Sequence, residues 1–125
     1  MKMFRTPATF VFSLLLALTA NLGVMYRDGK GVTRDYAEAV KWFRPAAAQG
    51  NAYAQFNLGV MYRDGKGVTQ DYVRAHMWFN ANAVSGDADA VENRDNVAKR
   101  MTTQQIAEAQ NMARECLANK FKGCE

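Results

Sequence analysis

NLGVMYRDGKGVT occupies residues 21–33 of this 125-residue chain, and the same thirteen letters return at residues 57–69. Aligning residues 21–50 with residues 57–86 gives twenty identities in thirty positions. A catalytic loop has no need of a second copy, whereas a structural unit that stacks on itself does. A fixed period in the thirties is typical of a helical solenoid, in which each repeat is a pair of helices. The duplicated peptide therefore predicts architecture rather than a catalytic site.

The second copy indicates how one repeat would fold. Residues 51–63 carry apolar residues at helical spacing, among them Ala54 and Leu58, which gives one inward-facing stripe. Gly59 costs this helix roughly 1 kcal/mol of propensity against alanine, and we expect the close approach of a neighbouring helix to compensate. Gly65 tolerates the left-handed backbone of a helix C-cap. The first helix of the repeat is therefore predicted to end there.

A second helix is predicted to begin after Asp71, whose carboxylate can accept hydrogen bonds from free backbone N–H groups. In the first copy Asp35 precedes Glu38 by three places, which is the spacing of a capping box. The residues expected to be buried on the second helix are Tyr72, Ala75, Trp78, and Phe79 or Ala83. Each repeat thus reads as two antiparallel helices closed by a glycine.

The pattern LG-x-MY, G-x-GV-x-x-DY and A-x-x-WF, followed by a closing glycine, resembles the Sel-one-like repeat, a relative of the tetratricopeptide repeats. The resemblance covers residues 21–86 and occurs twice in register. It implies an all-α, right-handed α-solenoid of antiparallel helix pairs that serves as an adaptor surface for other proteins. Residues 21–50 would form a first repeat, truncated at its N-terminus, and residues 51–86 a second.

Residues 1–20 differ in kind from the rest. Lys2 and Arg5 are followed by an apolar run from Phe10 to Ala20, which is the layout of a secretory signal peptide. The run is too short to span a bilayer by itself; an uncleaved membrane anchor and an ordinary buried first helix are the alternatives. We expect a periplasmic or secreted protein whose one link to a membrane is this leader. Cleavage after Ala20 would leave the first helix barely two turns long.

The period ends after Gly86 in this interpretation, and residues 87–125 are predicted to form a capping pair of helices with a cysteine-containing tail. Thr102 and Gln105 have capping-box spacing at the start of the second of these helices. Its expected buried face is Ile106, Ala109, Ala113 and Leu117. The segment MTTQQIAEAQNMARE also resembles the C-terminal capping helices of bacterial members of the family. Terminal caps of this kind keep a solenoid soluble.

Cys116 and Cys124 are the two cysteines of the chain. An even count in an exported chain favours a disulfide. The spacing also resembles the cysteine-rich branch of the family, in which such pairs tie one helix to the start of the next. Two free thiols and a metal-binding pair are the alternatives, although two cysteines without a nearby histidine make a poor zinc site.

The pattern of the other residues predicts no catalytic site. His76, the one histidine, stands where the first copy has Val40, which favours packing over catalysis. Ser13 and Ser85 have no adjacent base that could be argued, and neither begins a Ser-x-x-Lys pattern. The DGKGV loop lacks Walker spacing, so no cofactor or metal site is predicted. The alternatives to a non-catalytic adaptor are a hydrolase acting on cell-wall or β-lactam compounds, suggested only by labels on cysteine-rich relatives, and a truncated non-functional remnant.

The net charge is +4, but Lys2 and Arg5 belong to the leader and the other basic residues are scattered among acids. Nucleic-acid binding is therefore not predicted. The predicted partner is a protein or peptide that lies along the first helices of the repeats. Side chains pointing away from the inward stripe are the candidate contacts, since aromatic and arginine side chains are frequent interface anchors. These candidates are Asn21, Val24, Arg27, Tyr53, Asn57, Val60 and Arg63.

Overall fold

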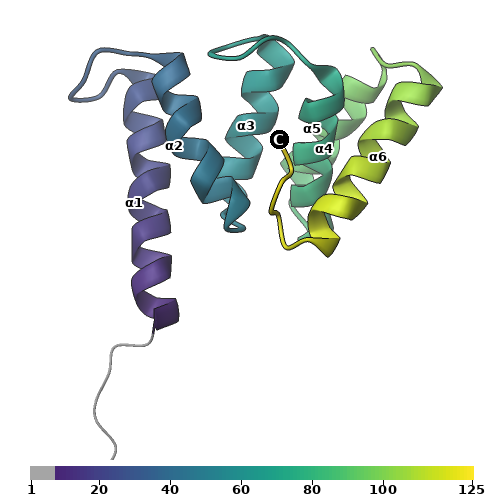
Figure 1. Cartoon of the computed structure of the whole chain (residues 1–125). Coiled ribbons are helices and arrows are strands. Elements are labelled where there is room, and N and C mark those ends of the chain that lie inside the picture. Colours follow the sequence, from purple (N-terminus) through teal and green to yellow (C-terminus); the bar gives the residue numbers. More distant parts are fainter. Residues whose placement is uncertain (1–7) are drawn as a thin grey trace, which may run out of the picture.

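The computed structural model describes residues 8–125, with side chains from Leu18 onward. Residues 1–7 of the predicted signal peptide lie outside the described residues. Within the described range the chain forms six helices and no strand (Figure 1). The helices are α1 (Ala8–Asp28), α2 (Tyr36–Ala48), α3 (Ala52–Asp64), α4 (Tyr72–Val84), α5 (Ala88–Ala98) and α6 (Thr103–Ala118). The predicted all-α fold is confirmed.

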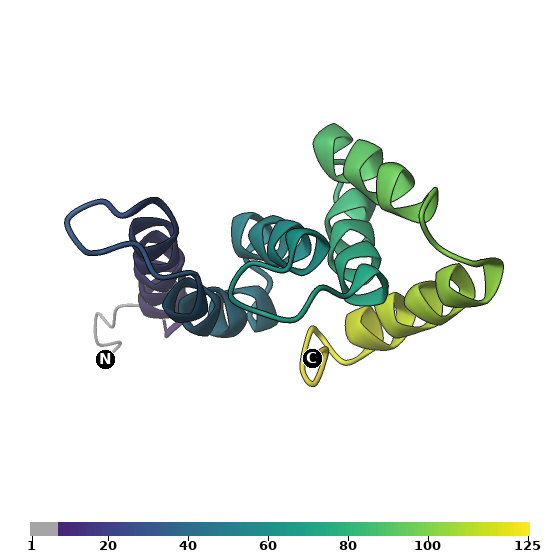
Figure 2. The same cartoon turned by 90° about the horizontal axis from the view of Figure 1, so that it is seen from above.

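Consecutive helices stack into a solenoid, as the duplicated peptide predicts. Helix α1 packs on α2 and α3 packs on α4, while α2 contacts α3 and so joins the two pairs (Figure 1). Helices α5 and α6 both pack against α4 and diverge from each other in the view from above (Figure 2). The last two helices therefore cover the end of the solenoid by packing mainly on α4 rather than on each other. Their connection, residues 99–102, is shorter than residues 65–71 between α3 and α4 and has no glycine-capped turn.

Helix α5, which follows the predicted end of the period at Gly86, shares part of the residue pattern of α3. Three capping or buried positions of α3 recur thirty-six residues later in α5. The pairs are Asn51 and Asp87, Ala54 and Ala90, and Met61 and Val97. Both members of the first pair are N-caps, and the members of the other two pairs are buried to the same extent. Helix α5 therefore keeps one N-cap and two core positions of α3, while the glycine motif does not recur after Gly86.

The glycines inside the first helices mark close approach between helices, as expected for Gly59. A Cβ atom placed on Gly59 would lie 2.6 Å from Cε1 of Phe79, and one on Gly23 would lie 2.6 Å from Cε1 of Phe43. Real Cβ atoms do not approach carbon this closely. The two contacts are the same contact one repeat apart, so the duplicated sequence places α1 on α2 as it places α3 on α4.

The predicted helix boundaries follow from capping residues. Gly65 takes the left-handed conformation at the end of α3, with φ 67° and ψ 39°. The Asp71 carboxylate accepts a hydrogen bond of 3.0 Å from the backbone N–H of Arg74, and Asp35 accepts the equivalent bond in the first repeat. The predicted capping box between Thr102 and Gln105 is also present. These local predictions are confirmed.

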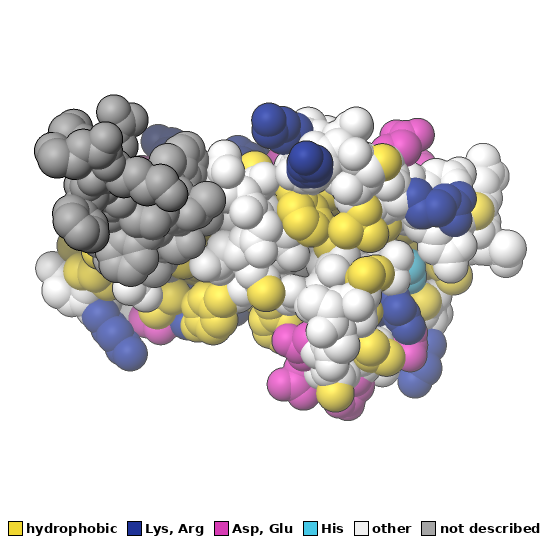
Figure 3. Space-filling view, turned by 90° about the horizontal axis from the view of Figure 1, so that it is seen from below, with side chains coloured by type: hydrophobic (Ala, Val, Ile, Leu, Met, Phe, Trp, Pro, Cys, Tyr) yellow, Lys and Arg dark blue, Asp and Glu magenta, His cyan; other side chains and the backbone are white. Residues whose placement is uncertain are grey.

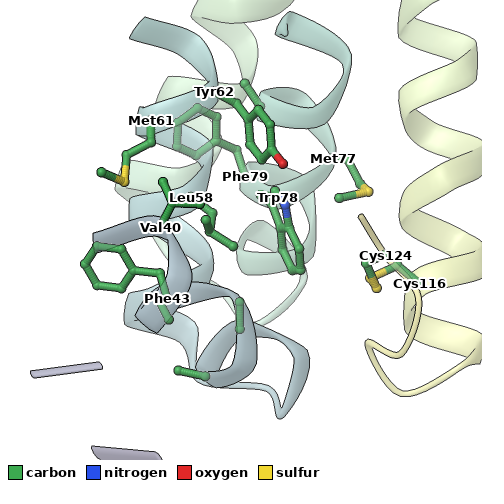
Figure 4. Packing of buried hydrophobic residues seen from close by; sticks show 14 of the residues in the cluster. Val40, Phe43, Leu58, Met61, Tyr62, Met77, Trp78, Phe79, Cys116 and Cys124 are labelled. Carbon is green, nitrogen blue, oxygen red and sulfur yellow. A yellow bond between two sulfur atoms is a disulfide. The ribbon is translucent and has the colours of Figure 1, made fainter. Parts of the chain in front are cut away.

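The hydrophobic core is one cluster that runs along the solenoid. It extends from Phe43 of α2 through Leu58 of α3 to Trp78 of α4, and the disulfide lies at its edge (Figure 4). Three expected core positions differ. Tyr72 and Ile106 are only half-buried, and Leu117 is 37% exposed, whereas Cys116, one position earlier, is buried.

The first helix continues through the expected cleavage position. Helix α1 is 21 residues long, and Ala20 is 5% exposed within the core. Signal-peptide cleavage stays a prediction. None of the helices in residues 8–125 has the length and apolar character that crossing a membrane requires.

The predicted disulfide is present in the tail. Cys116 and Cys124 are bonded, with a Cα–Cα distance of 5.2 Å, and both are buried. The closed loop returns the tail to the body of the solenoid, where Phe121 packs against the core and Tyr62 donates a hydrogen bond to Glu125. The bond therefore ties the tail to α6, and Glu125 of the tail in turn contacts the second repeat.

Candidate functional site

The first candidate site is a cavity of about 310 Å³ at the junction of the first two repeats. Its walls come from the end of α1, the loop after it, the start of α2, helix α3 and the loop that follows α3. We call it the first junction pocket. It is lined by Arg27, Asp28, Arg34, Tyr36, Asn57, Val60, Met61 and Lys66.

The same cavity is built again one repeat later. The second junction pocket has a volume of about 700 Å³ and lies between the end of α3, the start of α4, and α5. It is lined by Arg63, Asp64, Gln70, Tyr72, Asn96, Val97, Lys99 and Arg100. Its first four residues stand thirty-six positions after Arg27, Asp28, Arg34 and Tyr36. The end of each first helix and the start of each second helix are therefore brought together twice in the same way.

An arginine in the last turn of each first helix holds successive repeats together. Arg27 Nε donates to Asp28 Oδ1 at 2.8 Å, and its Nη1 donates to Asn57 Oδ1 on α3. Arg63 repeats both contacts, with 2.8 Å to Asp64 and 2.6 Å to Asn93 on α5. A cation in this position also interacts favourably with the carbonyl end of its own helix.

The asparagines that receive these arginines are held in place by their own helices. Asn57 Nδ2 donates to the Tyr53 carbonyl oxygen at 2.8 Å, and Asn93 Nδ2 donates to the Asp89 carbonyl oxygen at the same distance. Each amide oxygen is thereby turned toward the preceding helix. Asn57 is only 4% exposed, so the prediction that it points to solvent is wrong. Asn57 was predicted to face outward because the spacing of apolar residues shows only which side of the helix is apolar. It gives no information about a polar contact with a residue thirty positions away.

Each of the two arginines shifts the pKa of the aspartate that follows it in the chain. The Arg27 guanidinium lowers the pKa of Asp28, and the Arg63 guanidinium lowers the pKa of Asp64. In return, these carboxylates raise the pKa of both arginines. Because Nε, Nη1 and Nη2 of each guanidinium all have partners within the chain, Arg27 and Arg63 act first as internal braces.

The other predicted contact residues divide into two groups. Asn21 is exposed, and Tyr53 is 50% exposed with its ring centroid 5.9 Å from Cζ of Arg27. Val24 and Val60 are half-buried and pack against the core. The first junction pocket thus contains Arg27, Asn57 and Val60, and the second contains Arg63. Tyr53 contacts Arg27 but lines neither pocket, and Asn21 and Val24 line neither as well.

Sequence analysis missed the basic residues that line the pockets outside any ion pair, although the charge of one of them, Lys66, also helps to lower the pKa of Asp64. Arg34 and Lys66 belong to the first junction pocket, and Lys99 and Arg100 to the second. Among residues 8–125 none of these four forms an ion pair. A sequence signal was available at the matching asparagines, since Asn21, Asn57 and Asn93 follow one another at intervals of thirty-six.

Residues weighed for catalysis occupy structural positions. His76 is 3% exposed, and burial, reinforced by the nearby charge of Arg94, lowers its pKa. Ser85 donates to the Asn82 carbonyl oxygen at 2.7 Å at the end of α4. In the described part of the chain no three His, Cys, Asp or Glu side chains are grouped closely enough to hold a metal ion.

A family model for the Sel1 repeat matches residues 19–51 and 52–81. The chain belongs to the Sel1 repeat family. The predicted resemblance is therefore confirmed. Sel1 repeat proteins are generally scaffolds for protein–protein interaction.

Two solved structures share the Sel1 repeat architecture. A protective antigen present in uropathogenic Escherichia coli strains, which displays an SLR fold, is 34% identical, with a TM-score of 0.81 over 87% of this chain and 24% of the antigen. A Sel1 repeat protein from Oxalobacter formigenes is 35% identical, with a TM-score of 0.63 over 66% of this chain and 62% of that protein. The present chain thus spans about a quarter of the length of the antigen. No curated protein matches it.

Proposed function

We propose that this Sel1 repeat chain is a non-catalytic scaffold that binds a protein or peptide partner outside the cytoplasm. The partner lies along the edge formed by the two junction pockets and the exposed ring of Tyr53. The observation that carries the proposal is the repetition of the pocket. Equivalent residues build it at two successive junctions, so one extended partner meets similar surroundings twice.

The braces described above support this function physically. Arg27 and Arg63 fix the spacing of successive first helices through Asn57 and Asn93. A partner therefore meets a preorganised edge, and little of the binding free energy is lost to ordering it. A site formed on packed helices also holds its geometry better than a site on loops alone.

The proposed location is supported by two features. The Cys116–Cys124 disulfide suits an oxidising compartment. The basic start and apolar run of residues 1–20 have the layout of an export signal. Both features fit a periplasmic or secreted scaffold.

The proposal is tested by site-specific cross-linking in the native cell. A benzoylphenylalanine replaces Tyr53, which is 50% exposed beside Arg27, and the matched control replaces Val84, which is 65% exposed at the end of α4. We expect one discrete protein adduct from position 53 and none from position 84. Equal labelling at both positions, or no adduct at position 53, would contradict the proposed edge. Sustained nitrocefin turnover by the pure protein would instead favour the rival hydrolase.

A further inference from the structure

The geometry points to an acidic segment as the partner's contact region, with one group of carboxylates bound at each junction pocket. This inference rests on the proposed scaffold function and adds the chemistry of the partner. Each pocket lining contains three basic side chains and one acidic side chain. The acidic residue in each case, Asp28 or Asp64, is already paired with its neighbouring arginine. The unneutralised charge at both junctions is therefore positive.

At the first junction this charge is presented around one aromatic ring. The Arg34 guanidinium carbon lies 5.3 Å from the centroid of the Tyr36 ring, and Lys66 Nζ lies 5.4 Å from it. The ring positions both cations by cation–π attraction without neutralising them. Lys66 comes from the loop after α3 and Arg34 from the loop after α1, so two repeats contribute charge to one pocket. An incoming carboxylate can pair with both.

At the second junction different residues supply the same charge. Arg100 Nη1 lies 3.4 Å from the Tyr72 hydroxyl, and Lys99 Nζ lies 3.5 Å from Asn96 Oδ1. Both partners are neutral, so these contacts orient the cations and leave their charge free. Position 70 holds glutamine where the first copy has Arg34. The second pocket thus obtains its two free cations from the turn that follows α5, which maintains the charge of the site although the loop residue has changed.

An acidic protein segment fits this arrangement better than a nucleic acid does. The free cations form two separate groups, and each group stands beside a paired carboxylate. A nucleic-acid backbone carries regularly spaced phosphates and is typically bound by a continuous basic stripe. At the opposite end of the molecule, the coloured part of Figure 3 shows basic and acidic side chains interspersed among apolar ones. Two clusters of Glu or Asp separated by a spacer match the edge instead.

The test uses a fluorescein-labelled synthetic peptide with two Glu-Glu-Glu clusters joined by Gly-Ser spacers of increasing length. Its binding to the full chain is measured by anisotropy at low salt. One variant, Arg34→Gln with Lys66→Gln, removes the free charge of the first pocket, and a second, Lys99→Gln with Arg100→Gln, removes that of the second. The control, Lys41→Gln with Lys122→Gln, removes the same number of charges from exposed positions outside both junction pockets.

We expect each pocket variant to weaken binding roughly tenfold and the control to weaken it less than about twofold. Affinity should pass through a maximum at one spacer length, because the second cluster then reaches its pocket at the highest effective concentration. Either pocket variant should abolish this maximum.

Three results would overturn the inference: no binding of the peptide, equal weakening by the control variant, or tighter binding of an oligothymidine that competes with the peptide. The scaffold function would survive each of them if benzoylphenylalanine at position 53 still captured a partner. In that case the partner binds the same edge through a different chemistry.

Discussion

Replacing Gly59 with alanine should destabilise the protein although alanine is the better helix former. The new Cβ would lie 2.6, 2.8 and 3.0 Å from three carbons of the Phe79 ring, whereas carbon atoms pack best at about 3.5–4.0 Å. Phe79 is completely buried, so its ring cannot move aside into solvent. Overpacking of this kind costs about 1–3 kcal/mol, and three short contacts place the cost near the upper value. The gain in helix propensity, about 1 kcal/mol, offsets part of it.

The expected net loss in the free energy of unfolding is about 2 kcal/mol, which corresponds to roughly 6–12 °C in Tm for a domain of this size. Thermal and urea unfolding followed by circular dichroism at 222 nm would measure it. Gly23→Ala should cost the same amount, because its Cβ meets Phe43 at 2.6 Å in the equivalent contact.

A double variant checks the cause of the loss. Phe79→Leu removes the ring atoms that the new Cβ would strike, so combining it with Gly59→Ala should cost clearly less than the sum of the two single changes. A neutral or stabilising Gly59→Ala, or strictly additive costs, would refute the claim that the glycines let the paired helices approach closely.

Three further changes have defined outcomes. Burial lowers the pKa of His76 below its unfolded value, so the folded state resists protonation. The contribution of His76 to stability should therefore be full above about pH 6.5 and fall as the pH drops below it. His76→Val, which copies the fully buried Val40, should give a flat Tm between pH 7 and 5. Cys116→Ala with Cys124→Ala should lower the free energy of unfolding by about 2.5 kcal/mol in the chain-entropy account of a loop this short, and a loss near zero in urea titrations would contradict it. Asp71→Ala should cost about 1 kcal/mol through the lost N-cap, with Asp71→Asn restoring most of it in the same titration.

Local signals made much of the fold predictable. Three residues predict local features without information about distant residues. Gly59 indicates a close approach between helices, Gly65 a left-handed C-cap and Asp71 an N-cap. The repetition of these residues thirty-six positions apart then indicated that the units stack, because identical peptides favour identical backbones. For the same reason the pairing of α1 with α2 could be inferred from the pairing of α3 with α4.

Long-range polar contacts were not predictable in this way. Asn57 was predicted to face outward because the apolar stripe of α3 gives no information about a polar contact with Arg27 on α1. The likeness of α5 to α3 was missed because the shared positions, such as Asp87, Ala90 and Asn93, include none of the glycine motif. The packing of α6 on α4 was not predicted, because no residue in the short connection before α6 indicates which helix it contacts.

In the candidate site, too, local features were predictable from the sequence and long-range contacts were not. Arg27 and Arg63 were recognisable as periodic surface residues, but their role as internal braces depends on asparagines thirty positions later. The free cations Lys99 and Arg100 lie in a segment where the repeat motif is lost, so only the structure relates them to Arg34 and Lys66. Charge at a repeat junction can thus be maintained by different positions in successive repeats.

The most direct test of the scaffold account is hydrogen–deuterium exchange of the protein alone and with the partner captured at position 53. The account predicts slowed exchange along one edge, in the loops of residues 29–35 and 65–71 and in residues 96–102, with the tail unchanged. Protection confined to residues 119–125, or to a single junction, would show that the repeated pockets do not act together as the binding surface.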